Sequence, residues 1–250
     1  VLDNFMYGQN SLAHACCEPG FNVVRGDVRV KHTVAPLLDK ADIIIPLAAL
    51  VGAPACERDP EGATTINRDA ILMMLDLINK DHAILMPTTN SAYGTGDKDN
   101  YCTEESELRP LTQYAKEKVA IEKALMKRKN SISFRLATVF GMSPRMRIDL
   151  LVNDFTYRAV HDRCVVLFES SFKRNYIHIL DIARVFIHAI NHFERMKGEI
   201  YNVGLSDANL SKKELCERIQ KQLPGFVFQE AAIGKDPDQR NYVVSNEKIE

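Results

Sequence analysis

Tyr114 and Lys118 are the side chains whose types and spacing are best suited to chemistry. They stand four positions apart in the segment Tyr-Ala-Lys-Glu-Lys, and on a helix that spacing puts the phenol and the ammonium on one face. A phenol with a pKa of about 10 is a poor base at neutral pH, but a fixed neighbouring cation favours the phenolate. Lys118 would therefore activate Tyr114 as an acid/base group. An exposed helical Tyr/Lys pair without a function is the alternative.

Hydroxyl and amide side chains follow a buried strand that we expect upstream of this pair. Residues 88–94 read Thr-Thr-Asn-Ser-Ala-Tyr-Gly, and strand ends in open α/β sheets deliver side chains into the ligand crevice. A threonine hydroxyl there can hydrogen-bond the substrate oxygen that Tyr114 deprotonates, which completes a Thr/Tyr/Lys constellation. A polar turn capped by its own hydroxyls is the alternative.

The composition excludes several classes of protein. The chain has 250 residues, of which 46% are apolar and 26% charged, so it can bury a core without metal or disulfides. A net charge of -1 without long Lys/Arg runs argues against nucleic-acid or anionic-membrane partners. Six scattered cysteines without a CxxC pair predict reduced thiols and no metal site. No apolar run is long enough for a membrane span or resembles a signal core, so we expect a cytoplasmic protein.

Short β-branched runs alternate with amphipathic stretches of helix length, which predicts βαβ units and a mainly parallel sheet. The predicted strands are residues 21–25, 41–46, 83–86, 132–136, 165–168, 176–179 and 200–203. The predicted helices lie near residues 31–40, 61–80, 111–129, 148–162, 181–195 and 211–222. No Gly/Ser-rich or Pro-rich linker separates the second part, so we expect it to interleave with the first.

Several short motifs of the chain, taken in sequence order, resemble those of the extended short-chain dehydrogenase/reductases. The resemblance is to the epimerase/dehydratase branch, which acts on nucleoside-diphosphate sugars. The resemblance covers essentially the whole chain. The matching segments are residues 1–5, 26–28, 47–49, 67, 88–94, 114–118, 135–141, 174–178 and 201–204. It implies an α/β fold with a Rossmann-type doubly wound parallel sheet, NAD as cofactor, and a smaller C-terminal substrate-binding lobe.

The first strand and its Gly-rich loop have no counterpart in this sequence. A dinucleotide fold opens with a strand and a glycine turn that lays the pyrophosphate on a helix N-terminus, whereas Val1-Leu2-Asp3 looks like the end of a second strand. We therefore expect a fragment of a longer protein. Residues 1–141 would form an N-terminally truncated NAD-binding domain, and residues 142–250 mainly the substrate lobe, with segments near 174–204 returning to the first domain.

The resemblance places the cofactor along the first half of the chain. Asp3, with Asn4 beside it, would meet the adenosine ribose, and an acidic residue there repels a 2′-phosphate, which favours NAD over NADP. Asp27 and Val28 would meet the adenine. The rest of the expected cofactor set is Leu47, Ala48 and Ala49 on the pyrophosphate path, with Asn67, Thr88, Tyr114 and Lys118.

The catalytic residues implied by the resemblance are Thr89, Tyr114 and Lys118. In the family's 4,6-dehydratases, the hydroxyl that matches Thr89 is followed by Asp-Glu, which supply the acid and base for water elimination. Here Asn90 and Ser91 follow, and neither exchanges a proton readily near neutral pH. The leading prediction is therefore a 4-epimerase-like reaction through a transient keto sugar. A keto-sugar reductase and a 4,6-dehydratase are alternatives, and a dinucleotide-sensing binding protein is the non-enzymatic one.

The expected substrate-binding residues are Asn90, Ser91, Tyr93, Arg145, Asn153, Arg174 and Arg240. Arg174 matches the family's arginine for the substrate diphosphate, because a guanidinium pairs phosphate in a bidentate fork, and Arg240 is its expected partner. Surface salt bridges are the alternative for both. The loop 143–149 departs from the family pattern, in which Pro directly follows the glycine. Arg145 and Asn153 could grip the substrate or orient the next helix.

A homodimer is also expected, because relatives often pair the helix that carries Tyr114 with the helix after Asn67. The apolar residues Leu111, Ala115 and Leu125 could equally pack on their own sheet.

Overall fold

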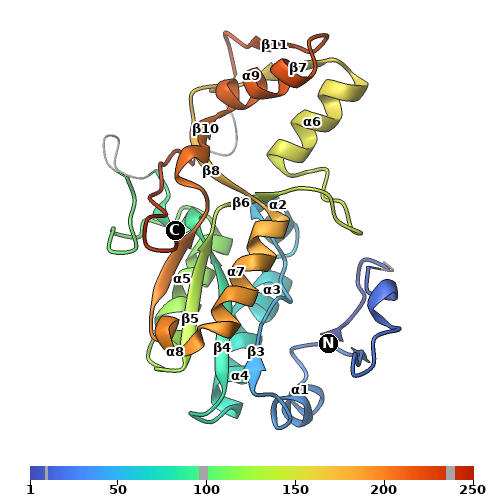
Figure 1. Ribbon diagram of the computed structural model, residues 1–250, viewed down its shortest axis with the longest axis vertical. Coiled ribbons are helices and arrows are strands. Elements are labelled where there is room, and N and C mark those ends of the chain that lie inside the picture. The colour runs from blue at the N-terminus through green and yellow to red at the C-terminus, as the bar shows by residue number, and fades with distance from the viewer. Residues whose placement is uncertain (9–10, 96–100, 235–239) are drawn as a thin grey trace. The chain divides into compact units, whose positions relative to one another are not determined.

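The structure is a computed structural model that describes residues 1–8, 11–95, 101–234 and 240–250. The chain divides into two compact units that alternate along the sequence. Unit 1 consists of Val1–Thr89, Pro110–Phe134 and His192–Ile200, and unit 2 of Asn90–Arg109, Arg135–Asn191 and Tyr201–Glu250. Most helices and strands of each unit can be followed by their labels in Figure 1.

Parallel strand pairs make up the sheets of unit 1. β1 (Leu2–Asp3) pairs with β2 (Val24–Arg25), and β3 (Ile43–Ile44) pairs with β4 (Ala83–Thr89), both in parallel. β3, β4 and β5 (Ser131–Leu136) lie next to one another in one sheet, and β9 (Ile200–Val203) belongs to unit 2 from its second residue. The start of β4 is a continuous apolar run that is fully buried, as expected for a strand covered on both faces. Its polar end, Thr88-Thr89, is buried as well.

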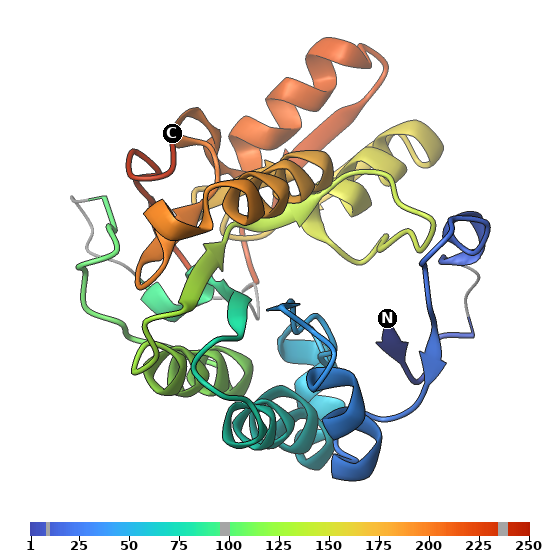
Figure 2. The same cartoon turned by 60° about the horizontal axis from the view of Figure 1, so that its bottom comes forward.

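Unit 1 also contains helices, including one over Gln113–Leu125 that packs on β4. They are η1 (Ala13–Ala15), α1 (Lys31–Leu38), α2 (Ala53–Arg58), α3 (Pro60–Ala63), the π-helix η2 (Thr64–Asp69), α4 (Ala70–Leu77), α5 (Gln113–Leu125) and α8 (Phe193–Met196). Figure 2 shows α4 and α5 side by side. The Thr112 hydroxyl accepts a hydrogen bond from the Ala115 N–H at 3.3 Å, so a capping residue fixes where α5 begins.

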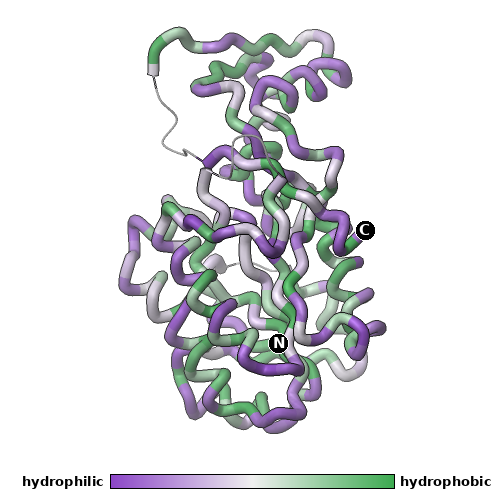
Figure 3. The backbone as a smooth tube through the Cα atoms, turned by 90° about the vertical axis from the view of Figure 1, so that its left-hand side faces the viewer, coloured by the Kyte–Doolittle hydropathy of each residue, from purple (hydrophilic) through white to green (hydrophobic). Residues whose placement is uncertain are grey.

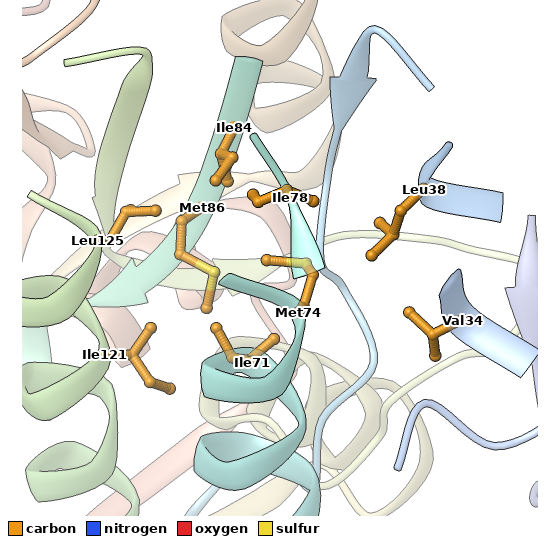
Figure 4. Close-up of a cluster of buried hydrophobic side chains, with 9 residues drawn as sticks. All are labelled: Val34, Leu38, Ile71, Met74, Ile78, Ile84, Met86, Ile121 and Leu125. Atoms are coloured by element: carbon orange, nitrogen blue, oxygen red, sulfur yellow. The ribbon is translucent and has the colours of Figure 1, made fainter. Parts of the chain in front are cut away.

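An apolar cluster joins α1, α4, β4 and α5 (Figure 4). Its buried members are Val34, Leu38, Ile71, Met74, Ile78, Ile84, Met86, Ile121 and Leu125. Removing a large side chain from such a cluster costs about 2–5 kcal/mol, so these contacts strongly fix α5 against β4. The helix face that carries Tyr114 is thereby set with respect to the strand that ends at Thr89.

Unit 2 contains two further sheets. β6 (Thr138–Phe140) pairs in parallel with β8 (Lys173–His178), and β10 (Asn209–Ser211) pairs antiparallel with β8. β7 (Cys164–Leu167) and β11 (Val227–Glu230) form a parallel pair. The helices are η3 (Asn90–Tyr93), α6 (Leu151–His161), α7 (Ile179–Asn191), η4 (Ser206–Ala208) and α9 (Lys212–Gln222). A separate apolar cluster, which includes Phe155, Leu167 and Phe226, forms the core of this unit.

Each strand and helix predicted from the sequence has a counterpart, although the ends shift. The helix predicted near residues 61–80 is instead a succession of α3, the π-helix η2 and α4, and the one predicted near 181–195 is divided into α7 and α8. The sequence did not reveal α2, β6, β10 and β11, or the short helices η1, η3 and η4. These elements have at most six residues, too few to display a period. The predicted α/β class with mainly parallel pairing is confirmed.

Within the described residues, every helix is too short or too polar to cross a membrane. Figure 3 shows hydrophilic residues interspersed with hydrophobic ones along the described chain.

Candidate functional site

Tyr114 and Lys118 lie one turn apart on α5, as the sequence predicted. The Lys118 side chain is buried, with 5% of its surface exposed, and its Nζ donates a hydrogen bond to the Pro87 carbonyl at 3.1 Å. Pro87 lies in β4 two residues before Thr89, the last residue of that strand. Lys118 is therefore anchored directly beside the end of the strand that carries the predicted catalytic hydroxyl.

Burial has the largest effect on the pKa of Lys118. Desolvation lowers the pKa of its ammonium to about 8, while Cys56 and the Glu117 carboxylate act in the opposite direction. Among the described residues, the Pro87 carbonyl is the single hydrogen-bond acceptor of this ammonium, which carries further N–H donors. A buried cation with unused donors is suited to hold the hydroxyl groups of a ligand.

One residue predicted at the cofactor, Val28, lies with Tyr114 in a second apolar cluster of unit 1. Val28 and Tyr114 both pack, half-buried, against Leu50, Cys56, Ala63 and Ile66. The side chains of Leu47 and Ala48, which follow β3, are exposed, and 66% of the Leu47 surface is open. An apolar side chain left open at a strand end is a surface on which a ligand can lie.

Asn67 lies in the π-helix η2 and is fully buried. Its Oδ1 accepts from the Leu50 N–H at 2.8 Å, and its Nδ2 donates to the Leu50 carbonyl at 3.0 Å. These two bonds fix the backbone directly after the predicted pyrophosphate segment, residues 47–49. A direct contact of Asn67 with the cofactor stays a prediction.

Asp3 and Asp27 lie at the carboxyl ends of two neighbouring parallel strands, since Asp3 ends β1 and Asp27 follows β2. The Asp3 Oδ1 accepts from the Phe5 N–H at 2.7 Å, and the Asn4 Oδ1 accepts from the Met6 N–H at 3.0 Å. Arg29 holds Asp27 in an ion pair and lowers the pKa of its carboxyl. The structure thus brings Asp3, Asn4 and Asp27 to one edge of this sheet, as parallel pairing requires.

In unit 2, the predicted substrate residues Ser91, Arg174 and Arg240 form a connected chain. The Arg174 guanidinium is buried and donates from Nη1 to the Arg240 carbonyl at 3.0 Å. The Arg240 Nη1 in turn donates to the Ser91 hydroxyl. The two arginines that the sequence paired for the diphosphate are therefore neighbours.

Tyr93 is fully buried in unit 2, where its hydroxyl bonds to protein groups. It lies 2.6 Å from the Asn202 Oδ1 and 2.9 Å from the Thr103 carbonyl, and it accepts from the Arg135 Nη1 at 2.9 Å. Burial raises the pKa of this phenol to about 12, against the opposing effect of Arg135. A substrate contact for Tyr93 stays a prediction. The spacing of residues 88–94 could not reveal these distant partners.

The buried amide of Asn90 has no hydrogen-bond partner within the described residues. Such a group is costly and needs an explanation, which a water or a ligand could supply.

Asn153 is held by side-chain hydrogen bonds to the loop before α6, and Arg145 lies in that loop. The Asn153 Oδ1 accepts from the Gly141 N–H at 3.0 Å, and its Nδ2 donates to the Arg147 carbonyl at 2.9 Å. Of the two functions considered for Asn153, the geometry favours orienting the loop before α6. Gly141 has a φ of +118°, and a Cβ there would lie 2.5 Å from the His178 Nε2, so this loop requires glycine. The Arg145 carbonyl accepts from the Ser143 hydroxyl at 2.7 Å.

The sequence reasoning missed two buried carboxylates on α5, Glu117 and Glu122. A usable signal existed for Glu122, which continues the four-residue spacing of Tyr114 and Lys118 by one more turn.

Comparison with known proteins places the chain in a family. Residues 1–204 match the model of the NAD-dependent epimerase/dehydratase family, so the chain belongs to that family. This confirms the resemblance drawn from the motifs. NAD, the cofactor expected from the sequence, is the cofactor that defines the family.

Individual relatives are distant in sequence. A low-salt glycan biosynthesis protein of Haloferax volcanii is 26% identical over 235 residues, which cover 90% of this chain and 74% of that protein. The structure of Thermus thermophilus UDP-glucose 4-epimerase with NAD superposes with a TM-score of 0.82 at 21% identity, covering 100% of this chain and 83% of the other. For the dTDP-glucose 4,6-dehydratase of Streptomyces venezuelae the values are 0.82, 23%, 100% and 79%. At this identity the two structures establish the Rossmann-type fold, and they do not separate epimerase from dehydratase.

Proposed function

We propose that the protein is an NAD-dependent epimerase of a nucleoside-diphosphate sugar, which works through a transient keto sugar with Tyr114 as acid/base. The observation that carries the proposal is the Tyr114–Lys118 pair on α5, with the Lys118 ammonium buried and bonded to β4 just before Thr89. A buried cation one helical turn from a phenol favours the phenolate, and thus a base that functions near neutral pH.

The residues of unit 1 fit NAD. Lys118 has unused donors for ribose hydroxyls, Leu47 offers an open apolar surface, and Asp3 and Asp27 meet at one sheet edge. We assign Asp3, Asn4, Asp27, Val28, Leu47, Ala48, Ala49, Asn67, Thr88, Tyr114 and Lys118 to its binding. When bound, NAD supplies a reversible oxidation of a carbinol carbon to a carbonyl.

In the proposed reaction, the Tyr114 phenolate accepts the proton of a sugar hydroxyl as that carbon is oxidised. The Thr89 hydroxyl hydrogen-bonds the same oxygen, and the Lys118 ammonium stabilises the phenolate. In the return step, the keto sugar has flipped to present its other face, and Tyr114 gives the proton back. No net oxidation results, so the cofactor is restored in each cycle.

The residues after Thr89 favour epimerisation over water elimination. Asn90 and Ser91 stand where the family's dehydratases have an acid and a base, and an amide and an alcohol exchange protons poorly near neutral pH. The amide of Asn90 has no hydrogen-bond partner in the part of the chain that the structure describes, and we assign it to a sugar hydroxyl. We assign the sugar and its diphosphate to unit 2, through Asn90, Ser91, Tyr93, Arg145, Arg174 and Arg240, with Asn153 acting through the loop that it orients.

We further propose a homodimer that functions in the cytoplasm. Cys16, Cys17 and Cys164 are exposed thiols, which suits a reducing compartment.

The test is Tyr114→Phe, with Tyr157→Phe on the exposed face of α6 as the matched control. Each protein is given UDP-glucose, UDP-glucuronic acid and dTDP-glucose, and the sugar products are identified by NMR. We expect an epimer without net NADH formation, and a loss of at least about 10²-fold in Tyr114→Phe with NAD still bound. Normal turnover by Tyr114→Phe refutes the assignment. Stoichiometric NADH consumption would identify a reductase, and a 4-keto-6-deoxy product a dehydratase. Bound NAD without turnover of any sugar would favour the sensor.

A further inference from the structure

Glu122 is a buried carboxylate that the proposed reaction does not use. It lies on α5 one turn beyond Lys118 and two turns beyond Tyr114, and 4% of its surface is exposed. Taking a carboxylate out of water costs several kcal/mol unless hydrogen bonds compensate. Its place on the same helix face as the reacting pair indicates that its contacts there have a function.

The contacts of Glu122 join three elements of unit 1. Its Oε2 accepts from the Ser133 hydroxyl of β5 at 2.7 Å and from the Thr88 hydroxyl of β4 at 3.3 Å. Thr88 Oγ1 also lies 3.0 Å from Ser133 Oγ and 3.1 Å from the Phe134 carbonyl. The carboxylate thus ties helix α5 to two neighbouring strands, near the end of β4 and in the middle of β5.

These bonds set the register of α5 along β4. Lys118 bonds to the Pro87 carbonyl and Glu122 to the Thr88 hydroxyl, so successive turns of the helix hold successive residues of the strand. The next residue of the strand is Thr89. A slide or rotation of α5 would break both bonds, and it would change the distance between the Tyr114 phenol and the Thr89 hydroxyl.

We propose that Glu122 is a positioning residue, which locks α5 onto the end of β4 and so holds Tyr114 and Thr89 in the geometry that the reaction needs. This inference rests on the proposed function of Tyr114. Reaction rates are sensitive to such geometry, because a displacement of about 1 Å can cost roughly 100-fold.

Glu117 provides a matched control on the same helix. It is equally buried, at 5% exposure, but its Oε1 accepts from the Thr64 hydroxyl at 2.7 Å and from the Gln113 Nε2 at 3.0 Å. Its bonds therefore lead to η2 and to its own helix, and not to β4. Glu117 also raises the pKa of Lys118, so its removal should act on charge rather than on register.

The experiment compares Glu122→Ala, Glu122→Gln and Glu117→Gln in the protein. The substrate is whichever of UDP-glucose, UDP-glucuronic acid and dTDP-glucose the parent protein turns over. For Glu122→Ala we expect kcat to fall roughly 10- to 100-fold, with KM and the Kd for NAD within about threefold, the signature of an interaction that serves the transition state. Glu122→Gln should restore most of kcat, because its carbonyl oxygen still accepts from Ser133.

The pH profile separates positioning from electrostatics. Glu122→Ala should lower kcat at every pH and leave the limbs of the profile in place. Glu117→Gln should keep the maximum and move the alkaline limb to lower pH, because Lys118 loses a stabilising anion. Should Glu122→Ala not fold, Ser133→Ala removes the shorter bond to the carboxylate and should give a smaller loss of kcat.

The following outcomes would overturn the positioning function. The first is a kcat for Glu122→Ala within about threefold of the parent value. The second is a Kd for NAD that rises by the same factor as kcat falls. The third is a kcat for Glu122→Gln as low as that for Glu122→Ala. A Tyr114→Phe protein that is inactive beside a fully active Glu122→Ala would refute this inference alone. A fully active Tyr114→Phe would refute the proposed function itself.

Discussion

Lys118 shows most directly how a single residue trades stability for chemistry. Its ammonium is buried, and desolvation lowers its pKa from 10.5 to about 8. Between these two pH values the unfolded chain binds the proton and the folded chain does not, so the free energy of unfolding rises with pH across that window. Below pH 8 both states are charged, and the full desolvation cost is present in the folded protein.

Lys118→Met should therefore be inactive and yet at least as stable as the parent at pH 7. We expect its free energy of unfolding to be higher by roughly 1 to 3 kcal/mol, and this advantage should shrink as the pH rises from about 8 towards 10.5. Urea unfolding at several pH values measures it, with the exposed Lys123→Met on the same helix as control. A Lys118→Met protein that is less stable at pH 7 would contradict the prediction.

Residue types and spacing predicted which side chains share a helix face. They did not predict contacts between residues far apart in the sequence. The four-residue spacing correctly predicted that Tyr114 and Lys118 share a helix face. Nothing in the sequence links the Tyr93 hydroxyl to Asn202, which lies 109 positions away. That contact depends on tertiary packing, and so does the burial of Lys118.

Among the elements, the helix predicted near residues 61–80 departs most from its sequence pattern. An apolar period predicts one continuous helix near residues 61–80, but the chain forms the π-helix η2 between α3 and α4. The wider turn coincides with Asn67, whose amide bonds to both backbone groups of Leu50. Turns of this kind are frequent at functional sites. A helical period cannot reveal one, because the bonds to Leu50 connect segments 17 positions apart.

Asn67→Ala tests whether these bonds hold the segment after β3. It leaves the buried Leu50 N–H without its partner and removes the amide donor from the Leu50 carbonyl, which keeps only the weaker bond from the Cys56 Sγ at 3.4 Å. Each such loss costs about 1–3 kcal/mol. We expect the free energy of unfolding to fall by about 2 to 4 kcal/mol in the absence of NAD. Asn191→Ala, at the exposed end of α7, should change it by less than about 0.5 kcal/mol. A similar small change in Asn67→Ala, measured by urea unfolding, would show that η2 does not depend on the amide.

For the whole molecule, the alternation of apolar runs and amphipathic stretches was sufficient to predict the α/β class and the parallel pairing. The same pattern did not predict which segments form each of the two compact units. Strands of three or four residues, such as β6, β10 and β11, are too short to show a period. The resemblance to the family rested on several weak motifs in a fixed order. Each motif alone arises readily by chance, so only their joint order is specific.

The proposed homodimer is the prediction that belongs to this scale. It would pair α5 with the helix after Asn67, α4, on which Leu72 presents an apolar side chain that is 36% exposed. An unpaired carboxylate buried at an interface costs several kcal/mol, so Leu72→Glu should raise the dissociation constant of the dimer by roughly 100-fold or more. Val160→Glu, at a 60% exposed apolar position on α6, should leave the dimer intact.

Sedimentation velocity at several protein concentrations distinguishes the outcomes. The parent and Val160→Glu should sediment as dimers at concentrations where Leu72→Glu is a monomer. A monomeric parent protein would refute the dimer. A dimer that persists in Leu72→Glu would place the interface on another face, because an apolar contact at α4 could not tolerate the charge.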